Sequence, residues 1–303
     1  MKKYLSILCL FLTAVIWGFA FVFQVKGTEH IGSFTFNATR FVLGTVSLIP
    51  VVLIFEGKKI FRGEIKLKKI LPGWIVCGSI LCIASSLQQI GLKITGSAGL
   101  GGFITSIYTV LTPVMYFLIF KKKTKLPVWI GAFMAVAGLG FLCIKPGVGL
   151  SFGFGEVLLL IGAVFWAAHM ISVDHFAREL PSLSFAWGQF LVCTLLSLVC
   201  AFVVESGDFS FEVLMDAKWD IIYCGAASVG IAYTLQIIGQ KNADPTFAAI
   251  VFSLESVFSA VGGVIFGIDS ISLIGYIGCS IIFGGIVISQ LDFSRKNTKQ
   301  PVK

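Results

Sequence analysis

A carboxylate interrupts one of the apolar stretches of this chain. Glu255 lies near the middle of residues 245–266, which are otherwise rich in Ala, Val, Ile, Phe and Ser. If this stretch is a membrane-crossing helix, Glu255 is about 15 Å from either surface at a rise of about 1.5 Å per residue. A bare carboxylate at that depth is costly, so it should be protonated, paired or open to water. Three roles compete: a proton-coupling group, a ligand for a substrate amine, and a structural hydrogen-bonding acid.

Arg40 is a basic residue in a similar setting. It lies inside the apolar stretch 34–55, nearer to the N-terminal end of that stretch. Its long side chain could snorkel to the outer surface, contact an anionic substrate, or pair inside the protein. All three explanations stay open.

Uncharged polar and aromatic residues recur at helical spacing in other apolar stretches. Residues three or four apart share one face of a helix. Such faces are Thr13, Trp17, Ala20 and Gln24; Ser85, Gln88 and Gln89; Thr105, Tyr108, Thr109 and Thr112; Gly162, Trp166 and His169; Tyr233, Gln236 and Gln240; and Glu255, Ser256 and Ser259. We expect these faces to surround one central cavity, with substrate contacts from Trp17, Gln88, Tyr108, Thr109, Trp166, His169, Tyr233 and Gln236.

Each of these residues also has a packing explanation. Ser and Thr in membrane helices often hydrogen-bond a carbonyl one turn earlier. Gln88 and Gln236 could join helices to one another, and His169 could be a satisfied buried imidazole. Trp17 and Trp166 lie near mid-depth, away from the interfacial belt where Trp usually collects, which favours cavity contact for this pair.

Signatures of catalysis and metal binding are weak or missing. His169 and Asp174 match a short acyltransferase pattern, but five residues of helix place them about 140° apart. No H-E-x-x-H, phosphate-binding loop or dinucleotide fingerprint occurs. The eight cysteines lie in apolar runs without a C-x-x-C pair, which indicates small apolar filler. We therefore expect no catalytic residue, no metal and no cofactor. The alternatives are an intramembrane enzyme acting on a lipid or small molecule, and a uniporter or channel-like facilitator.

The elements that must hold these residues are membrane helices. The chain is 57% hydrophobic and only 13% charged, whereas about a quarter of the residues of a soluble domain are charged. Ten apolar runs have the roughly 20 residues needed to cross about 30 Å of hydrocarbon. They are residues 5–25, 34–55, 71–91, 97–119, 126–144, 155–174, 182–204, 218–240, 245–266 and 271–290. The composition and these runs predict an all-α membrane protein with ten transmembrane helices.

The second half of the chain repeats the first. A shift of 149 residues carries Ala14-Val15-Ile16-Trp17 onto Ala163-Val164-Phe165-Trp166. The same shift carries Ser33-Phe34-Thr35-Phe36 onto Ser182-Leu183-Ser184-Phe185. We predict two five-helix repeats, residues 1–147 and 148–303. Because five is odd, the second repeat should enter the bilayer inverted relative to the first, as in many carriers with a site at the midplane.

Loop charges predict the orientation. With the N-terminus inside, the cytoplasmic segments hold eighteen of the 23 Lys and Arg residues. The opposite side holds Lys26, Lys93, Lys145 and Lys218, together with an acidic loop at 205–220. By the positive-inside rule both termini are cytoplasmic. The net charge of +8 does not indicate a nucleic-acid partner, because most of the basic residues lie in short loops beside the predicted membrane spans.

Two further features concern packing. Gly131, Ala135 and Gly138 form a small-residue face, as do Gly275, Gly278 and Gly285. Such faces permit close helix contact, so the fifth and tenth apolar runs, residues 126–144 and 271–290, should be packing or oligomer surfaces. Pro113 should kink the fourth run, residues 97–119, close to the cavity.

Several short motifs resemble those of the EamA-type carriers of the drug/metabolite transporter superfamily. They are Ala-Val-Ile-Trp-Gly at 14–18, Arg40-Phe41, Gly-Phe-Ile-Thr-Ser-Ile-Tyr at 102–108, Leu-Thr-Pro at 111–113 and Ser-Leu-Glu-Ser-Val-Phe at 253–258. Length, span number and repeat agree, so the resemblance covers essentially the whole chain. Ser256 departs from the Leu-Glu-Pro pattern of the family.

The resemblance implies a multi-pass carrier of the bacterial cytoplasmic membrane that exports amino acids or other small metabolites. The expected mechanism is alternating access, with proton antiport through Glu255 or uniport as the two modes of coupling. One chain holds both halves of the site, so a monomer should suffice. The expected partners are the small-molecule substrate, protons in the coupled case, and the lipid bilayer.

Overall fold

The computed structural model describes residues 2–121, 125–142, 144–145, 149–150, 152–177, 180–206, 210–240, 245–270 and 272–290. The first half folds into α1 (Lys2–His30), α2 (Ser33–Phe61), α3 (Leu67–Thr95), α4 (Ala98–Ser106), α5 (Tyr108–Phe120) and α6 (Leu126–Leu142). The second half folds into α7 (Phe154–Ala177), α8 (Ser182–Val204), α9 (Phe211–Asp216), α10 (Lys218–Ile222), the π-helix η2 (Tyr223–Ala232), α11 (Tyr233–Gln240), α12 (Pro245–Ile265) and α13 (Leu273–Gln290). Strands within these ranges are limited to the antiparallel pair β1 (Ile144–Lys145) and β2 (Gly149–Leu150).

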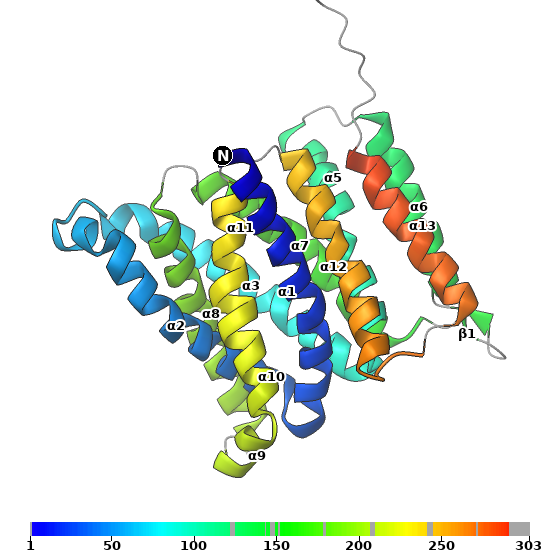
Figure 1. The fold of residues 1–303 in the computed structure, drawn as a ribbon, viewed down its shortest axis with the longest axis horizontal. Coiled ribbons are helices and arrows are strands. Elements are labelled where there is room, and N and C mark those ends of the chain that lie inside the picture. The colour runs from blue at the N-terminus through cyan, green and yellow to red at the C-terminus, as the bar shows by residue number, and fades with distance from the viewer. Residues whose placement is uncertain are drawn as a thin grey trace, which may run out of the picture.

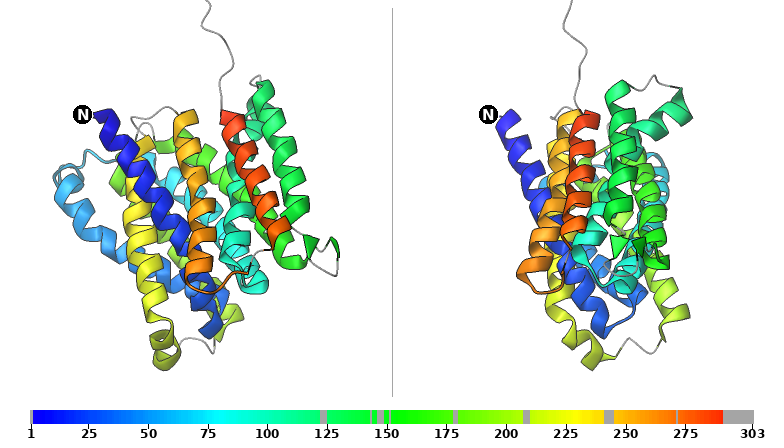
Figure 2. Two further views of the ribbon diagram at one scale, coloured as in Figure 1. Left: turned by 45° about the vertical axis from the view of Figure 1, so that its right-hand side comes forward. Right: turned by 90° about the vertical axis from the view of Figure 1, so that its right-hand side faces the viewer.

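The helices form one bundle, and α1 begins at the same end of it at which α13 finishes (Figures 1 and 2). Among the described residues, seven helices are long and apolar enough to cross a membrane: Tyr4–His30, Ser33–Phe61, Leu67–Thr95, Ala98–Ile119, Phe154–Phe176, Ser182–Val204 and Lys218–Gly239. Three shorter apolar helices, Leu126–Phe141, Val251–Ile265 and Leu273–Ser289, overlap the remaining predicted stretches.

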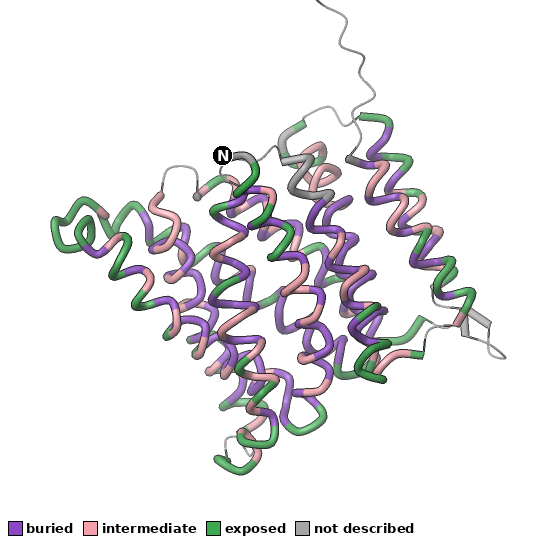
Figure 3. Tube along the Cα trace, viewed as in Figure 1, coloured by how far each residue is buried: buried purple, intermediate pink, exposed green. Residues whose placement is uncertain are grey.

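Large apolar side chains cover the outside of the bundle, where Figure 3 marks exposed positions on most helices. Phe55, Phe133 and Val203 are each more than 70% exposed. Contiguous apolar surface of this kind is unusual for a soluble protein and is what contact with lipid requires. The chain is a multi-pass, helical membrane protein.

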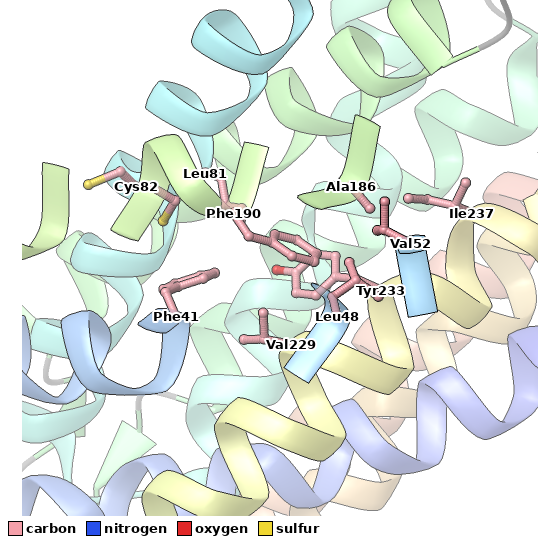
Figure 4. Packing of buried hydrophobic residues seen from close by; sticks show 11 residues of the cluster. Phe41, Leu48, Val52, Leu81, Cys82, Ala186, Phe190, Val229, Tyr233 and Ile237 are labelled. Carbon is pink, nitrogen blue, oxygen red and sulfur yellow. The ribbon is translucent and has the colours of Figure 1, made fainter. Parts of the chain in front are cut away.

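The core of the bundle lies where α2, α3, α8, η2 and α11 meet. The rings of Phe190 and Tyr233 lie against each other there, at 5.3 Å between centroids, and Phe41 lies beside Phe190 (Figure 4). Thr45 on α2 and Thr194 on α8 are hydrogen-bonded at 3.1 Å between their hydroxyl oxygens. These contacts fix α2 and α8 against each other at the centre.

Carboxylates from a distant part of the chain cap the starts of α2 and α8. Glu205 accepts hydrogen bonds from the backbone N–H groups of Phe34 (3.2 Å) and Thr35 (2.8 Å). Glu56 accepts them from the N–H groups of Leu183 (3.2 Å) and Ser184 (2.8 Å). The first N–H groups of a helix lack partners inside the helix and attract negative charge. Neither helix start has a side-chain cap on its own N-cap residue, so each depends on the other helix.

Two predicted helices are less regular than expected. The fourth apolar run is interrupted at Ile107, between α4 and α5. Tight bonds from Ile107 N to Ile104 O (3.2 Å) and from Val110 N to Ile107 O (3.0 Å) mark the interruption. Pro113 lies within α5, and the kink expected there stays a prediction. The eighth apolar run contains the π-helix η2, which the sequence analysis did not predict.

The small-residue faces pack α6 on α13, as predicted for the fifth and tenth apolar runs. A Cβ on Gly131 would lie 2.4 Å from the carbonyl oxygen of Gly285, and one on Gly138 would lie 2.7 Å from that of Gly278. Glycine is therefore required for this approach. The two helices stand together at one side of the bundle (Figure 1).

Candidate functional site

The central part of the bundle encloses a cavity with both polar and aromatic walls. Helices α1, α2, α3, α4, α5, α7, η2, α11 and α12 all contribute side chains to it. The lining residues are Trp17, Ala20, Phe21, Gln24, Arg40, Phe41, Gln88, Thr105, Tyr108, Trp166, His169, Met170, Ser228, Val229, Tyr233, Gln236 and Glu255. The space open to the centre of a water molecule is about 50 Å³, enough for a few waters.

Close contact between α1 and α12 positions one wall. A Cβ on Gly18 would lie 2.3 Å from Cβ of Phe258 and 2.8 Å from the carbonyl oxygen of Glu255. Only glycine therefore lets the two helices approach so closely, and this approach brings Trp17 and Glu255 to the same cavity. The indole N–H of Trp17 donates to the carbonyl of Ser228 at 3.3 Å.

The Ser228 carbonyl that bonds Trp17 belongs to the π-helix η2. In a π-helix the hydrogen bonds run to a carbonyl five residues away, and such segments are often found at functional sites. Ser228 O accepts from Trp17, and Ala232 O accepts from the Thr13 hydroxyl at 3.1 Å. The ring of Tyr233 meets that of Trp17 edge-on at 4.8 Å between centroids. Trp17 is thus held in one orientation by a hydrogen bond and an aromatic contact.

A chain of amide contacts joins α1, α3 and α7 on another wall. Gln88 donates from Nε2 to Oε1 of Gln24 at 3.0 Å and accepts from the Trp166 indole N–H at 2.7 Å. Gln89 donates to the backbone carbonyl of Gln24 at 2.9 Å. Gln88 therefore joins helices, as the packing explanation predicts, and also lines the cavity; its contact with substrate stays a prediction.

His169 and Gln236 likewise line the cavity while contacting neighbouring helices. His169 is 1% exposed, and its Nε2 lies 3.0 Å from Oε1 of Gln189. Gln236 Nε2 lies 3.3 Å from Sδ of Met170. These contacts orient both side chains.

Glu255 is the acidic group of the cavity. It is 3% exposed and accepts a hydrogen bond from the Ser106 hydroxyl at 3.3 Å. The phenol of Tyr108 also contacts its carboxyl group. Glu255 is therefore held by α4 and α5 from the first half of the chain, at the interruption around Ile107.

Arg40 also lines the cavity and does not snorkel to the surface, since it is 4% exposed. Its Cζ lies 5.1 Å from the ring centroid of Phe41 and 5.9 Å from that of Phe36. Its Nε is buried without a hydrogen-bond partner.

The structure brings all the predicted site residues to this cavity except Thr109. The Thr109 hydroxyl donates to the carbonyl of Ser106 at 2.8 Å, the local bond considered for Ser and Thr. The side chain of Gln240 lies outside the described residues. Sequence reasoning missed Phe21, Phe41, Met170, Ser228 and Val229. Phe21 and Met170 are related by the 149-residue shift, a signal that could have identified them.

No group of three His, Cys, Asp or Glu side chains in the described ranges could hold a metal ion. The cavity combines aromatic walls, amide groups, one cation and one acid inside a bundle of membrane helices, a lining typical of sites for organic molecules.

Comparison with known proteins agrees with the helical membrane architecture. The sequence profile of the EamA-like transporter family matches residues 4–144 and 153–291. An uncharacterized transporter of Archaeoglobus fulgidus is 25% identical over 291 residues, covering 96% of this chain and 87% of that protein. The uncharacterized transporter YrdR of Bacillus subtilis is 23% identical over 241 residues, covering 74% and 73%.

A solved crystal structure shares the fold. It superposes with a TM-score of 0.69 at 21% identity and covers 94% of this chain and 96% of its own. Since the family profile spans nearly the whole sequence, the chain belongs to the EamA-like transporter family and is a multi-pass membrane transporter.

Proposed function

We propose that this transporter is a secondary carrier that exports a small organic metabolite, such as an amino acid, by alternating access. Its two moving parts are two inverted five-helix repeats, residues 1–147 and 148–303, which hold the substrate between them. The membrane is the bacterial cytoplasmic membrane, with both termini in the cytoplasm.

The observation that carries this proposal is the set of contacts between equivalent positions of the two halves. Thr45 bonds Thr194, and Ser106 bonds Glu255, and in both pairs the partners are 149 residues apart. Such contacts are expected where a pseudo-twofold axis passes between two repeats.

The two carboxylate caps are also related by the 149-residue shift. The 149-residue shift carries Glu56 onto Glu205, and it carries Phe34 and Thr35 onto Leu183 and Ser184. The two caps are therefore one interaction made twice, once toward each end of the α2–α8 pair.

Helix packing follows the same pattern. In the first set of equivalent contacts, α1 packs on α12 and its counterpart α7 packs on α4 and α5. In the second set, α3 packs on α7, and its counterparts η2 and α11 pack on α1. Within each set, exchanging the two halves of the chain converts one contact into the other. In such a molecule, exchanging the conformations of the halves converts an inward-open state into an outward-open one, which supports alternating access.

Export is tested by comparing metabolites in cells and medium with and without overexpression of the chain. We expect at least one small metabolite to leave the cells faster and to reach the medium unaltered. An enzyme would change the compound chemically, so a new product in place of a relocated metabolite would contradict the proposal. Purified protein in liposomes should then accelerate counterflow of the same compound.

A further inference from the structure

Arg40 is a buried cation that faces the cavity without an acidic partner. In the described part of the chain, its guanidinium makes no ion pair with a carboxylate, and the ion pair observed there joins Arg62 to Glu64. Glu255 lines the same cavity, yet its carboxylate is held by Ser106 and is outside ion-pair range of Arg40.

The immediate neighbours of Arg40 do not replace such a partner. The rings of Phe36 and Phe41 lie within cation–π range, at 5.9 and 5.1 Å from Cζ. Aromatic rings offer no strong hydrogen-bond acceptor, and Nε remains buried without any partner. The Cys224 thiol lies within hydrogen-bonding reach, but a thiol is a weak acceptor.

An unpaired buried cation is costly, and an unpaired buried donor adds to the cost. Ionisable groups inside membrane helices commonly mark substrate pathways, and an anion that entered the cavity would pair with this one. Guanidinium groups suit this role because their N–H donors match the two oxygens of a carboxylate.

The side chains that line the rest of the cavity suit an apolar body attached to that anion, although the cavity of this conformation, with room for a few waters, must widen to admit it. Trp17, Trp166 and Tyr233 line it, and two of these are fixed by indole hydrogen bonds to Ser228 and Gln88. Rigid aromatic walls of this kind bury apolar or aromatic groups with little loss of entropy.

We propose that the substrate is an organic anion or zwitterion with an apolar or aromatic body, and that Arg40 binds its carboxylate. The inference rests on the transport function proposed above and adds the class of molecule that is carried. Arg40 is then a specificity-determining residue in direct contact with substrate.

The test uses the full chain, purified in detergent, and four compounds that share one body. They are 3-phenylpropionate, L-phenylalanine, 3-phenylpropionamide and L-phenylalaninamide. A ligand that binds the folded state stabilises it by RT ln(1 + [L]/Kd) and so raises the thermal unfolding midpoint. We expect the two carboxylates to give the same rise in the midpoint at concentrations about 10- to 100-fold lower than the two amides, as the loss of a charge-assisted hydrogen bond predicts.

Three variants locate the effect. Arg40→Gln should abolish the preference for carboxylates. Arg40→Lys should retain part of it, because Lys keeps the charge but lacks the paired N–H donors of a guanidinium group. Arg62→Gln is the matched control, since Arg62 is an exposed arginine in a surface pair, and it should keep the wild-type preference. If Arg40→Gln does not fold, the reduced preference of Arg40→Lys decides the question.

Three results would overturn the inference: equal stabilisation by amides and carboxylates, no stabilisation by either carboxylate, or an unchanged preference in the Arg40 variants. Flux in liposomes separates this inference from the transport proposal. If the carboxylates bind but neither they nor any metabolite in the export test crosses the membrane, the carrier proposal is contradicted and the anion site stands. If an amide crosses and the carboxylates do not, the carrier stands and the anion site is wrong.

Discussion

Tyr108 and Thr109 are neighbours in sequence, but only the first faces the cavity. Tyr108 contacts Glu255 and lines the central space, whereas the Thr109 hydroxyl bonds the carbonyl of Ser106. We expect Tyr108→Phe to lower the transport rate, because it removes a hydroxyl from the cavity. Thr109→Val is nearly isosteric and should leave transport close to wild type. Counterflow of the exported metabolite in liposomes measures both, and equal losses would show that the assignment of the two side chains is wrong.

Glu255 is the group through which proton antiport would act. Glu255→Gln keeps an acceptor for the Ser106 hydroxyl but cannot gain or lose a proton. If Glu255 couples transport to protons, counterflow of the variant should no longer change between two pH values at which the wild type differs. Glu64→Gln, at an exposed carboxylate, is the control and should keep the wild-type dependence. A variant at position 255 with full pH dependence would leave Glu255 as a structural acid and favour uniport.

Helical spacing and the repeat together identified most of the cavity at the residue level. Trp17, Gln88 and Trp166 could be predicted because polar or amphipathic residues at membrane depth tend to face inward. Ser228 could not, because it contributes a backbone carbonyl to Trp17, and a carbonyl is present at every residue. Thr109 is not among the residues that line the cavity, and its hydroxyl bonds a carbonyl of the preceding turn.

At the scale of elements, α2 and α8 stabilise each other through their caps. We expect Glu56→Gln and Glu205→Gln each to cost about 1 kcal/mol of unfolding free energy, within the range of lost caps and helix-dipole interactions. The two sites lie at different ends of the helix pair and share no partner, so the losses should add in the double variant.

Unfolding in detergent, followed by denaturant or heat, measures these losses. Glu64→Gln is again the control, and its effect should stay within about 0.5 kcal/mol, as is usual for surface positions. A large loss in one cap variant and none in the other would contradict their equivalence.

Hydropathy located the long helices, but it did not give all of their ends or the departures from regular helix. The apolar runs located α1, α2, α3, α7 and α8 because length and composition suffice for a membrane helix, yet α1, α2 and α3 extend several residues beyond the predicted runs. The π-helix at 223–232 lies where the carbonyls of Ser228 and Ala232 accept hydrogen bonds from side chains of α1. A single sequence carries no record of those partners. The short helix α9 was missed because six residues give too little periodicity.

For the whole molecule, the proposed inverted arrangement of the two halves makes a prediction about sidedness. Arg62 follows α2, and Met215 lies in α9 and is 39% exposed. With single cysteines as R62C and M215C, a maleimide that cannot cross membranes should label the first in inside-out vesicles and the second in right-side-out vesicles. The unsubstituted chain reports the background from native cysteines. Labelling of both positions from the same side would exclude two inverted five-helix repeats.

The internal similarity could be read from the sequence, since a shift of 149 residues relates Trp17 to Trp166 and Ser33 to Ser182. The sequence does not say which equivalent positions are in contact. The structure shows two such contacts, Thr45 with Thr194 and Ser106 with Glu255.

The Ser106–Glu255 contact also makes the two halves of the cavity chemically different. Two identical halves would place the same side chain twice at this point, and two glutamates 149 residues apart would meet as like charges in a medium of low dielectric constant. Serine in one half therefore allows an acid in the other. Arg40 likewise has Gln189 as its equivalent under the same shift, so the cation of the cavity comes from the first half of the chain and its acid from the second.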